Sequence, residues 1–180
     1  MHASFRLWIL LALPLAAAAA CAQKESRQPL TEVQVEQIRE AGIDPNERVK
    51  LYTKFVGEHV DTIKGLIKRG HSPARARRLD GELQDLTTLM DELGSNLDQY
   101  GDRKADMRAA LKPLSEDSHQ WADALRVLPS EAGFDLSLKE AIDSVKDLAD
   151  QSAQMLKEQT EYFTLHKDER GQDRAEPKSP

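Results

Sequence analysis

The sequence predicts an all-α protein whose helices pack along narrow apolar seams. Apolar residues recur every three or four positions through most of the chain, which is the period of one helix face. Helix-start patterns precede several of these stretches, and no strand-like alternation is found. The fold class we expect is antiparallel helical hairpins built on one long kinked helix, at about 74–127, with a coiled-coil-like seam.

The N-terminal segment 1–22 is expected to be a signal peptide. One arginine precedes an uncharged stretch at 7–20 that ends in alanines, an order typical of secretory signals. The triplet at 20–22 fits the A-x-A rule of an ordinary signal peptidase, whereas 18–21 resembles a lipobox whose Cys21 carries a lipid. The expected location is therefore the periplasm or cell envelope, with the protein either soluble or lipid-anchored through Cys21.

Composition narrows the function classes. The formal net charge is −6, and the signal peptide contains one basic residue and no acid, so the remaining chain is slightly more acidic. This charge argues against general nucleic-acid binding. Cys21 is the only cysteine, which excludes an internal disulfide and cysteine-based zinc or haem attachment. Only roughly a third of the residues after the signal peptide are apolar, below the usual 45–50%, so the core should be a thin helical seam.

Local patterns mark the first two helices. The segment 23–43 is expected to be a polar leader with a short helix at 31–41, because Thr31-x-x-Gln34 is a capping-box pattern. The clearest helix start follows, since Asp44 can cap the helix and Pro45 suits its first position. This second helix should span 45–69. Gly70 should end it, and Ser72-Pro73 should open the next helix.

The seam that follows is regular, and it leaves two arrangements open. Spacings of four and three alternate without a break from Leu79 to Leu128. This phase passes through Gly101, and a helix starting there would carry basic residues in its first turn, against the macrodipole. Both points favour one helix over 74–127, kinked at Pro113. The alternative is an up-down four-helix bundle in which the chain turns at Gly101.

The C-terminal part should hold one more helix. After a loop at 129–133, Ser137-x-x-Glu140 is a capping-box pattern, and apolar spacing then predicts a helix over 136–166. The helical domain as a whole is expected to cover 44–167. The segment 168–180 has mixed charge and almost nothing apolar, so it should be a disordered tail.

No motif in the chain predicts catalysis, and we expect neither a cofactor nor a metal. Glu116-x-x-His119 has the spacing of half a di-iron site, but the second half is missing, so this pair should lie in solvent. A haem- or metal-binding bundle is the alternative function. Its candidate inward ligands are methionines, which more often fill cores, and one histidine. These residues are Met90, Met107, Met155 and His166.

A cluster of cations surrounds the expected turn at Gly70, and no acid lies between Asp61 and Asp80. One end of the molecule should therefore be positive. It is a candidate surface for anionic lipid headgroups, an envelope polysaccharide or an acidic partner. The alternative is a solvated helix end that complements the helix dipole. The cluster comprises Lys64, Lys68, Arg69, Arg75, Arg77 and Arg78.

The large aromatic residues Trp121, Tyr162 and Phe163 are expected to be core, or otherwise to line an exposed partner groove. The stretch from Asp44 to Tyr52, together with the seam, resembles exported all-helical bacterial proteins of unknown function. That resemblance implies no catalytic or binding residue. We expect a non-enzymatic cell-envelope protein that acts through helix–helix or surface contacts, with a protein partner or self-association and no nucleic acid.

Overall fold

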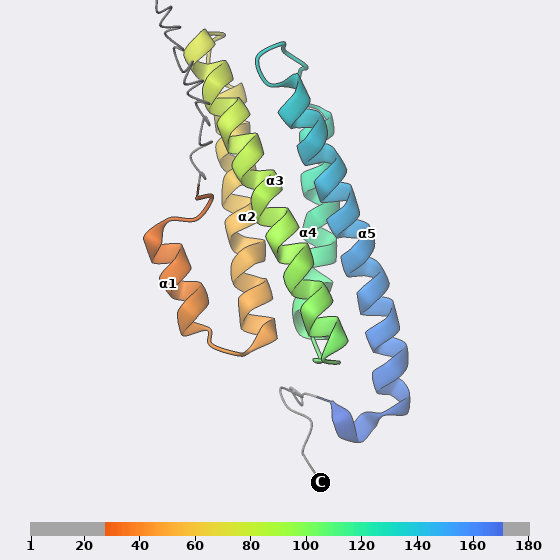
Figure 1. Cartoon of the computed structure of the whole chain (residues 1–180). Helices are drawn as coiled ribbons and strands as arrows, with labels where there is room; N and C mark the ends of the chain where they lie inside the picture. Colours follow the sequence, from red (N-terminus) through yellow and green to blue (C-terminus); the bar gives the residue numbers. More distant parts are fainter. Residues whose placement is uncertain (1–27, 171–180) are drawn as a thin grey trace, which may run out of the picture.

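The computed structural model describes residues 28–170, which form helices packed against one another as a bundle (Figure 1). Within that range no residue lies in a strand, so the all-α prediction is confirmed. The predictions for 1–22, including Cys21, and for 171–180 lie outside the described residues. The elements are α1 (Glu32–Glu40), α2 (Pro45–Ile67), α3 (Pro73–Asp102), α4 (Arg108–Arg126), α5 (Asp135–Leu165) and a short 3-10 helix, η1 (Lys167–Glu169).

The first three helices start where the sequence predicted. Thr31 and Gln34 form both hydrogen bonds of a capping box at the start of α1. The Asp44 carboxylate accepts hydrogen bonds from the first backbone N–H groups of α2, and Pro45 occupies its first position. The Ser72 hydroxyl accepts from the backbone N–H of Arg75 at the start of α3. Each of these caps satisfies helix N–H groups that have no partner within the helix.

The single long helix over 74–127 is wrong, because α3 ends at Asp102 and α4 begins at Arg108. The helix ends in a Schellman-type turn. In this turn the N–H of Ala105 donates to the carbonyl of Tyr100, and the N–H of Lys104 donates to that of Gly101. Lys104 adopts a φ of 54°, the left-handed conformation usually taken by glycine at this position.

A side chain from α5 holds this turn in place. The Gln159 amide accepts a hydrogen bond from the N–H of Met107 and donates one to the carbonyl of Ala105, each at 2.9 Å. Gln159 is itself buried. Two backbone groups of the turn are therefore satisfied by a residue more than fifty positions away.

The four long helices form the up-down bundle that was the alternative prediction. Their order around the bundle differs from their order along the chain. Each of α2 and α5 packs against both α3 and α4. Among the described residues, α2 therefore faces α5 across one diagonal, and α3 faces α4 across the other. Direction alternates along the chain, so α3 runs parallel to α5 and α2 parallel to α4 (Figure 1). The α3–α4 connection consequently crosses the end of the bundle.

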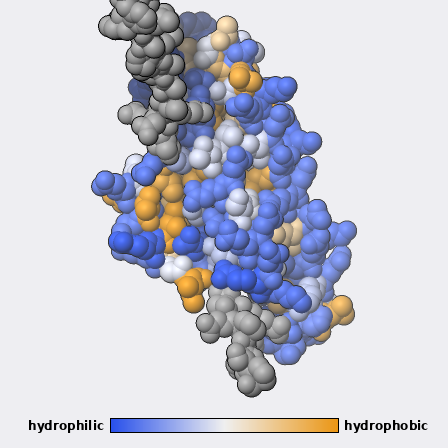
Figure 2. Space-filling view, in the orientation of Figure 1, coloured by the Kyte–Doolittle hydropathy of each residue, from blue (hydrophilic) through white to orange (hydrophobic). Residues whose placement is uncertain are grey.

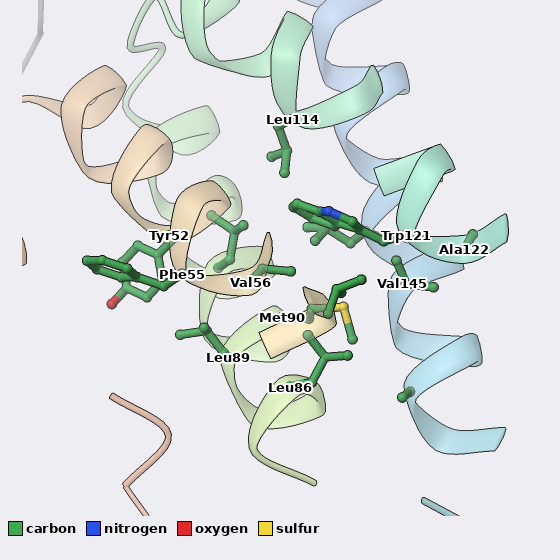
Figure 3. Packing of buried hydrophobic residues seen from close by; sticks show 14 of the residues in the cluster. Tyr52, Phe55, Val56, Leu86, Leu89, Met90, Leu114, Trp121, Ala122 and Val145 are labelled. Carbon is green, nitrogen blue, oxygen red and sulfur yellow. The ribbon is translucent and has the colours of Figure 1, made fainter. Parts of the chain in front are cut away.

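The core is built largely from the apolar residues whose three- and four-residue spacing predicted an inward face. Side chains from all four long helices point into one interior, including Val56 of α2, Met90 of α3, Trp121 of α4 and Val145 of α5 (Figure 3). Trp121 and Phe163 are buried, so their prediction as core residues is confirmed. Tyr162 is only half-buried, and its ring packs edge-on against that of Phe163.

The residues that carry the resemblance serve packing. The Arg48 guanidinium donates to the Tyr100 hydroxyl at 2.8 Å and to the Ile38 carbonyl at 3.2 Å, which joins α2 to α3 and to the end of α1. The Tyr52 hydroxyl donates to the Glu92 carboxylate at 2.5 Å. Burial, then the hydrogen bond to Glu92, raise the pKa of Tyr52 well above its usual range.

Two details near the C-terminus differ from the prediction. Ser137 lies inside α5, which begins at Asp135, and its hydroxyl donates to the Asp80 carboxylate at 2.5 Å instead of capping the helix. The tail was expected to be disordered from 168, yet residues up to Glu169 form η1. The Arg170 guanidinium donates to the Phe163 carbonyl at 2.8 Å, which fixes this turn against α5. Between residues 28 and 170, none of the helices combines the length and apolarity that a membrane span needs.

Candidate functional site: a basic tip

One end of the bundle brings together the α2–α3 turn and the α4–α5 connection (Figure 1). Four cations of the predicted cluster lie here with exposed side chains, and we call them the basic tip: Lys68, Arg69, Arg77 and Arg78. Within residues 28–170, none of the four forms an ion pair with a carboxylate. Their charge therefore faces solvent without a neutralising partner in the described chain.

The other two members of the predicted cluster differ from these four. Lys64 is exposed, but its ammonium lies 3.2 Å from the Asp61 carboxylate. For Arg75 the prediction of a surface cation is wrong. Its side chain is only 3% exposed, and its guanidinium bonds the Glu131 carboxylate at 2.5 Å. It also donates to the Ile67 carbonyl at 3.4 Å. Arg75 is thus a neutralised structural residue and does not belong to the surface patch.

The α4–α5 connection is attached firmly to the start of α3. Glu131 of the connection holds Arg75, as described. Gly133 approaches so closely that a Cβ added there would lie 2.9 Å from the Cβ of Ala76. One turn further on, Ser137 bonds Asp80. These contacts place the connection beside the basic tip.

Two large aliphatic side chains stand exposed at this end of the molecule. Val127, directly after α4, is 81% exposed, and Leu136, in the first turn of α5, is 67% exposed. Figure 2 shows an apolar spot over the α4–α5 connection among hydrophilic residues. The sequence reasoning missed both residues. Their positions could have indicated exposure, because both lie off the predicted apolar face. Val127 directly precedes Leu128, and Leu136 lies two residues before Leu138.

The residues considered for metal or haem binding lie in separate parts of the described chain. Glu116 and His119 are both exposed on α4, and no group of three or more metal-type side chains occurs in residues 28–170. Met90 and Met107 are buried in the apolar core, one within α3 and the other at the start of α4. His166 stacks on the ring of Tyr162 at the end of α5.

Hollows lie along the helices of the described chain. The first, of about 630 Å³, opens between α3 and α5 and is lined by Asp98, Lys104, Met155 and Gln159 among others. Its Gln159 amide is already bonded to the backbone of the α3–α4 turn, and the Lys104 ammonium lies over the Tyr162 ring. No side chain in this hollow has the arrangement of a nucleophile with a base.

The second hollow lies between α2 and α4. Gly57 there lies against the Trp121 indole, since a Cβ at Gly57 would be 3.9 Å from the ring. Asp117 shares this hollow, and burial together with the neighbouring Glu116 raises the pKa of its carboxyl above the usual value. An isolated carboxyl with a raised pKa is not by itself a catalytic arrangement.

Comparison of the chain with protein-family models, with curated proteins and with solved structures finds no match in any of the three. The geometry of the basic tip is therefore the feature that bears most directly on function.

Proposed function

We propose that this protein is a non-enzymatic component of the cell envelope that acts through surface contact, with the basic tip as its contact site for anionic groups. The observation that carries the proposal is the set of four exposed cations that have no carboxylate partner within residues 28–170, at one end of a chain whose net charge is −6. Because the chain as a whole is acidic, a group of exposed cations at one end would orient the protein toward an anionic partner.

The helix geometry strengthens this field. Arg77 and Arg78 lie within the first two turns of α3, and the first turn of α3 contains no acid. The N-terminus of a helix carries the positive end of the macrodipole, so cations there raise the positive potential and reduce helix stability. Acids stand in the first turn of α1, α2 and α5, but not in that of α3 or α4. At the start of α3 no acid therefore opposes the positive potential of the helix end and its cations.

The expected strength of the contact is modest. Each Lys or Arg near an anionic surface contributes about 1 kcal/mol, so four of them supply about 4 kcal/mol, equivalent to a Kd of about 1 mM. Such binding weakens steeply with salt, because exposed charges are screened beyond about 10 Å at 0.1 M salt. The cations alone thus provide orientation and weak capture.

A charge-matched pair of variants tests the proposal. The tip variant changes Lys68, Arg69, Arg77 and Arg78 to Gln, whereas the control changes four other exposed lysines to Gln. The control positions lie on α4, α5 and η1: Lys112, Lys146, Lys157 and Lys167. Retention on immobilised dextran sulfate at low salt is measured for both. The proposal expects the tip variant to lose retention and the control to keep it, whereas equal losses would show that only net charge matters.

A further inference from the structure

We propose that the basic tip binds the surface of an anionic lipid bilayer, with Val127 and Leu136 inserting among the headgroups. This inference rests on the proposed function of the tip and names its partner. The two side chains are 81% and 67% exposed. Val127 belongs to the α4–α5 connection and Leu136 to the first turn of α5, both at the end of the bundle that carries the α2–α3 turn. Cations next to protruding aliphatic side chains are the combination that interfacial membrane-binding surfaces use.

The aliphatic side chains distinguish a bilayer from other anionic partners. A polysaccharide or a soluble polyanion offers charge but no hydrocarbon, so it gains nothing from an exposed Val and Leu. A bilayer offers both, because anionic headgroups cover an apolar interior. The backbone near both residues is also held in place, since Arg75 donates to Glu131 in the connection and Ser137, next to Leu136, donates to Asp80. A fixed apolar group loses little conformational freedom on insertion.

The test uses protein exported from cells that express the full chain with Cys21→Ser, so that no lipid is attached. One variant changes Val127 and Leu136 to Ser. The matched control changes Ile43 and Leu165 to Ser, because these are 74% and 81% exposed at the opposite end of the bundle. Binding is measured by co-sedimentation with vesicles of phosphatidylcholine containing phosphatidylglycerol, and in parallel on immobilised dextran sulfate.

The proposal expects the Val127/Leu136 variant to bind these vesicles at least ten-fold more weakly while its retention on dextran sulfate is unchanged. The control should match the parent protein in both assays. Parent protein that binds dextran sulfate but not vesicles would overturn the bilayer as partner and leave the proposed function standing. Vesicle binding that is unaffected by the Val127/Leu136 changes would overturn the insertion. Failure to bind either probe would overturn the proposed function as well.

Discussion

The guanidinium of Arg75 donates hydrogen bonds to both carboxylate oxygens of Glu131, at 2.5 and 2.6 Å. Arg75 belongs to the first turn of α3, and Glu131 to the α4–α5 connection, 56 residues later in the chain. The pair therefore joins the start of α3 to the α4–α5 connection. It also makes Arg75 a neutralised internal residue, whereas the four cations of the basic tip face solvent.

Glu131→Gln should destabilise the protein strongly. The substitution leaves the buried Arg75 charge unpaired, and breaking a buried pair in this way costs about 3–5 kcal/mol. We expect the lower end of that range, because the Glu131 side chain is 26% exposed. Urea unfolding measures the change, and the double variant Arg75→Met/Glu131→Gln should recover most of the loss. A cost below about 1 kcal/mol for the single variant would contradict the buried pair.

Gly133→Ala should destabilise by about 1–3 kcal/mol, since the new Cβ would lie 2.9 Å from that of Ala76 and force the connection off α3. Gly65→Ala is the matched control. Nothing lies within 4 Å of a Cβ at Gly65 inside α2, so that change should stabilise by about 0.5–1 kcal/mol. Thermal unfolding of both variants gives the two signs, and a stabilised Gly133→Ala protein would refute the close approach.

Lys104→Gly separates the observed turn from a continuous helix. Lys104 has a φ of 54°, and relief of that backbone strain gains about 1–2 kcal/mol. Loss of the ammonium over the Tyr162 ring, worth about 0.5–1 kcal/mol at an exposed site, offsets part of the gain. The net effect should therefore be a small stabilisation. Inside a helix the same change would cost about 1 kcal/mol, as Lys112→Gly in α4 should. Equal destabilisation by the two substitutions would argue against the turn.

Asp117→Asn should stabilise the protein at neutral pH but not in acid. Burial, then Glu116, raise the pKa of the Asp117 carboxyl in the folded protein. The folded state therefore binds this proton more tightly, and stability is lost as the pH rises from the unfolded pKa through the folded one. The amide removes that loss, so the free energy of unfolding of the variant should rise at pH 7 and stay unchanged at pH 3. The expected gain is a few tenths of a kcal/mol, the size usual for surface substitutions. A gain that is equal at both pH values would indicate packing instead of ionisation.

The starts of α1, α2 and α3 could be predicted because their signals are local. Asp44-Pro45 and Ser72-Pro73 contain the cap and the first helical residue within two positions, and both initiate helices in the structure. The core positions were also predictable, since the four–three spacing identifies residues that face inward. That spacing cannot show whether the helix is continuous. Helices α3 and α4 both contribute seam residues to the same core, so the phase continues across the turn.

What could not be predicted depends on distant contacts. The α3–α4 turn has Lys104 where glycine is usual, and it is fixed by Gln159 of α5. Arg75 looks like its basic neighbours in the sequence, yet Glu131 determines that it is buried. The contacts between the α4–α5 connection and the start of α3 also place Val127 and Leu136 at the same end of the bundle as the basic tip. The sequence could therefore indicate a basic end but not its apolar component.

Membrane binding through the basic tip is tested most directly by measuring which end of the bundle meets the membrane. An environment-sensitive fluorophore is attached to a cysteine at Val127→Cys or, separately, at Leu165→Cys, each in the Cys21→Ser protein. These two positions are equally exposed, at 81%, and lie at opposite ends of the bundle. With vesicles containing phosphatidylglycerol, we predict a blue-shifted, brighter emission from the label at 127 and no change at 165. An equal response at both positions, or a response at 165 alone, would contradict membrane binding through the basic tip.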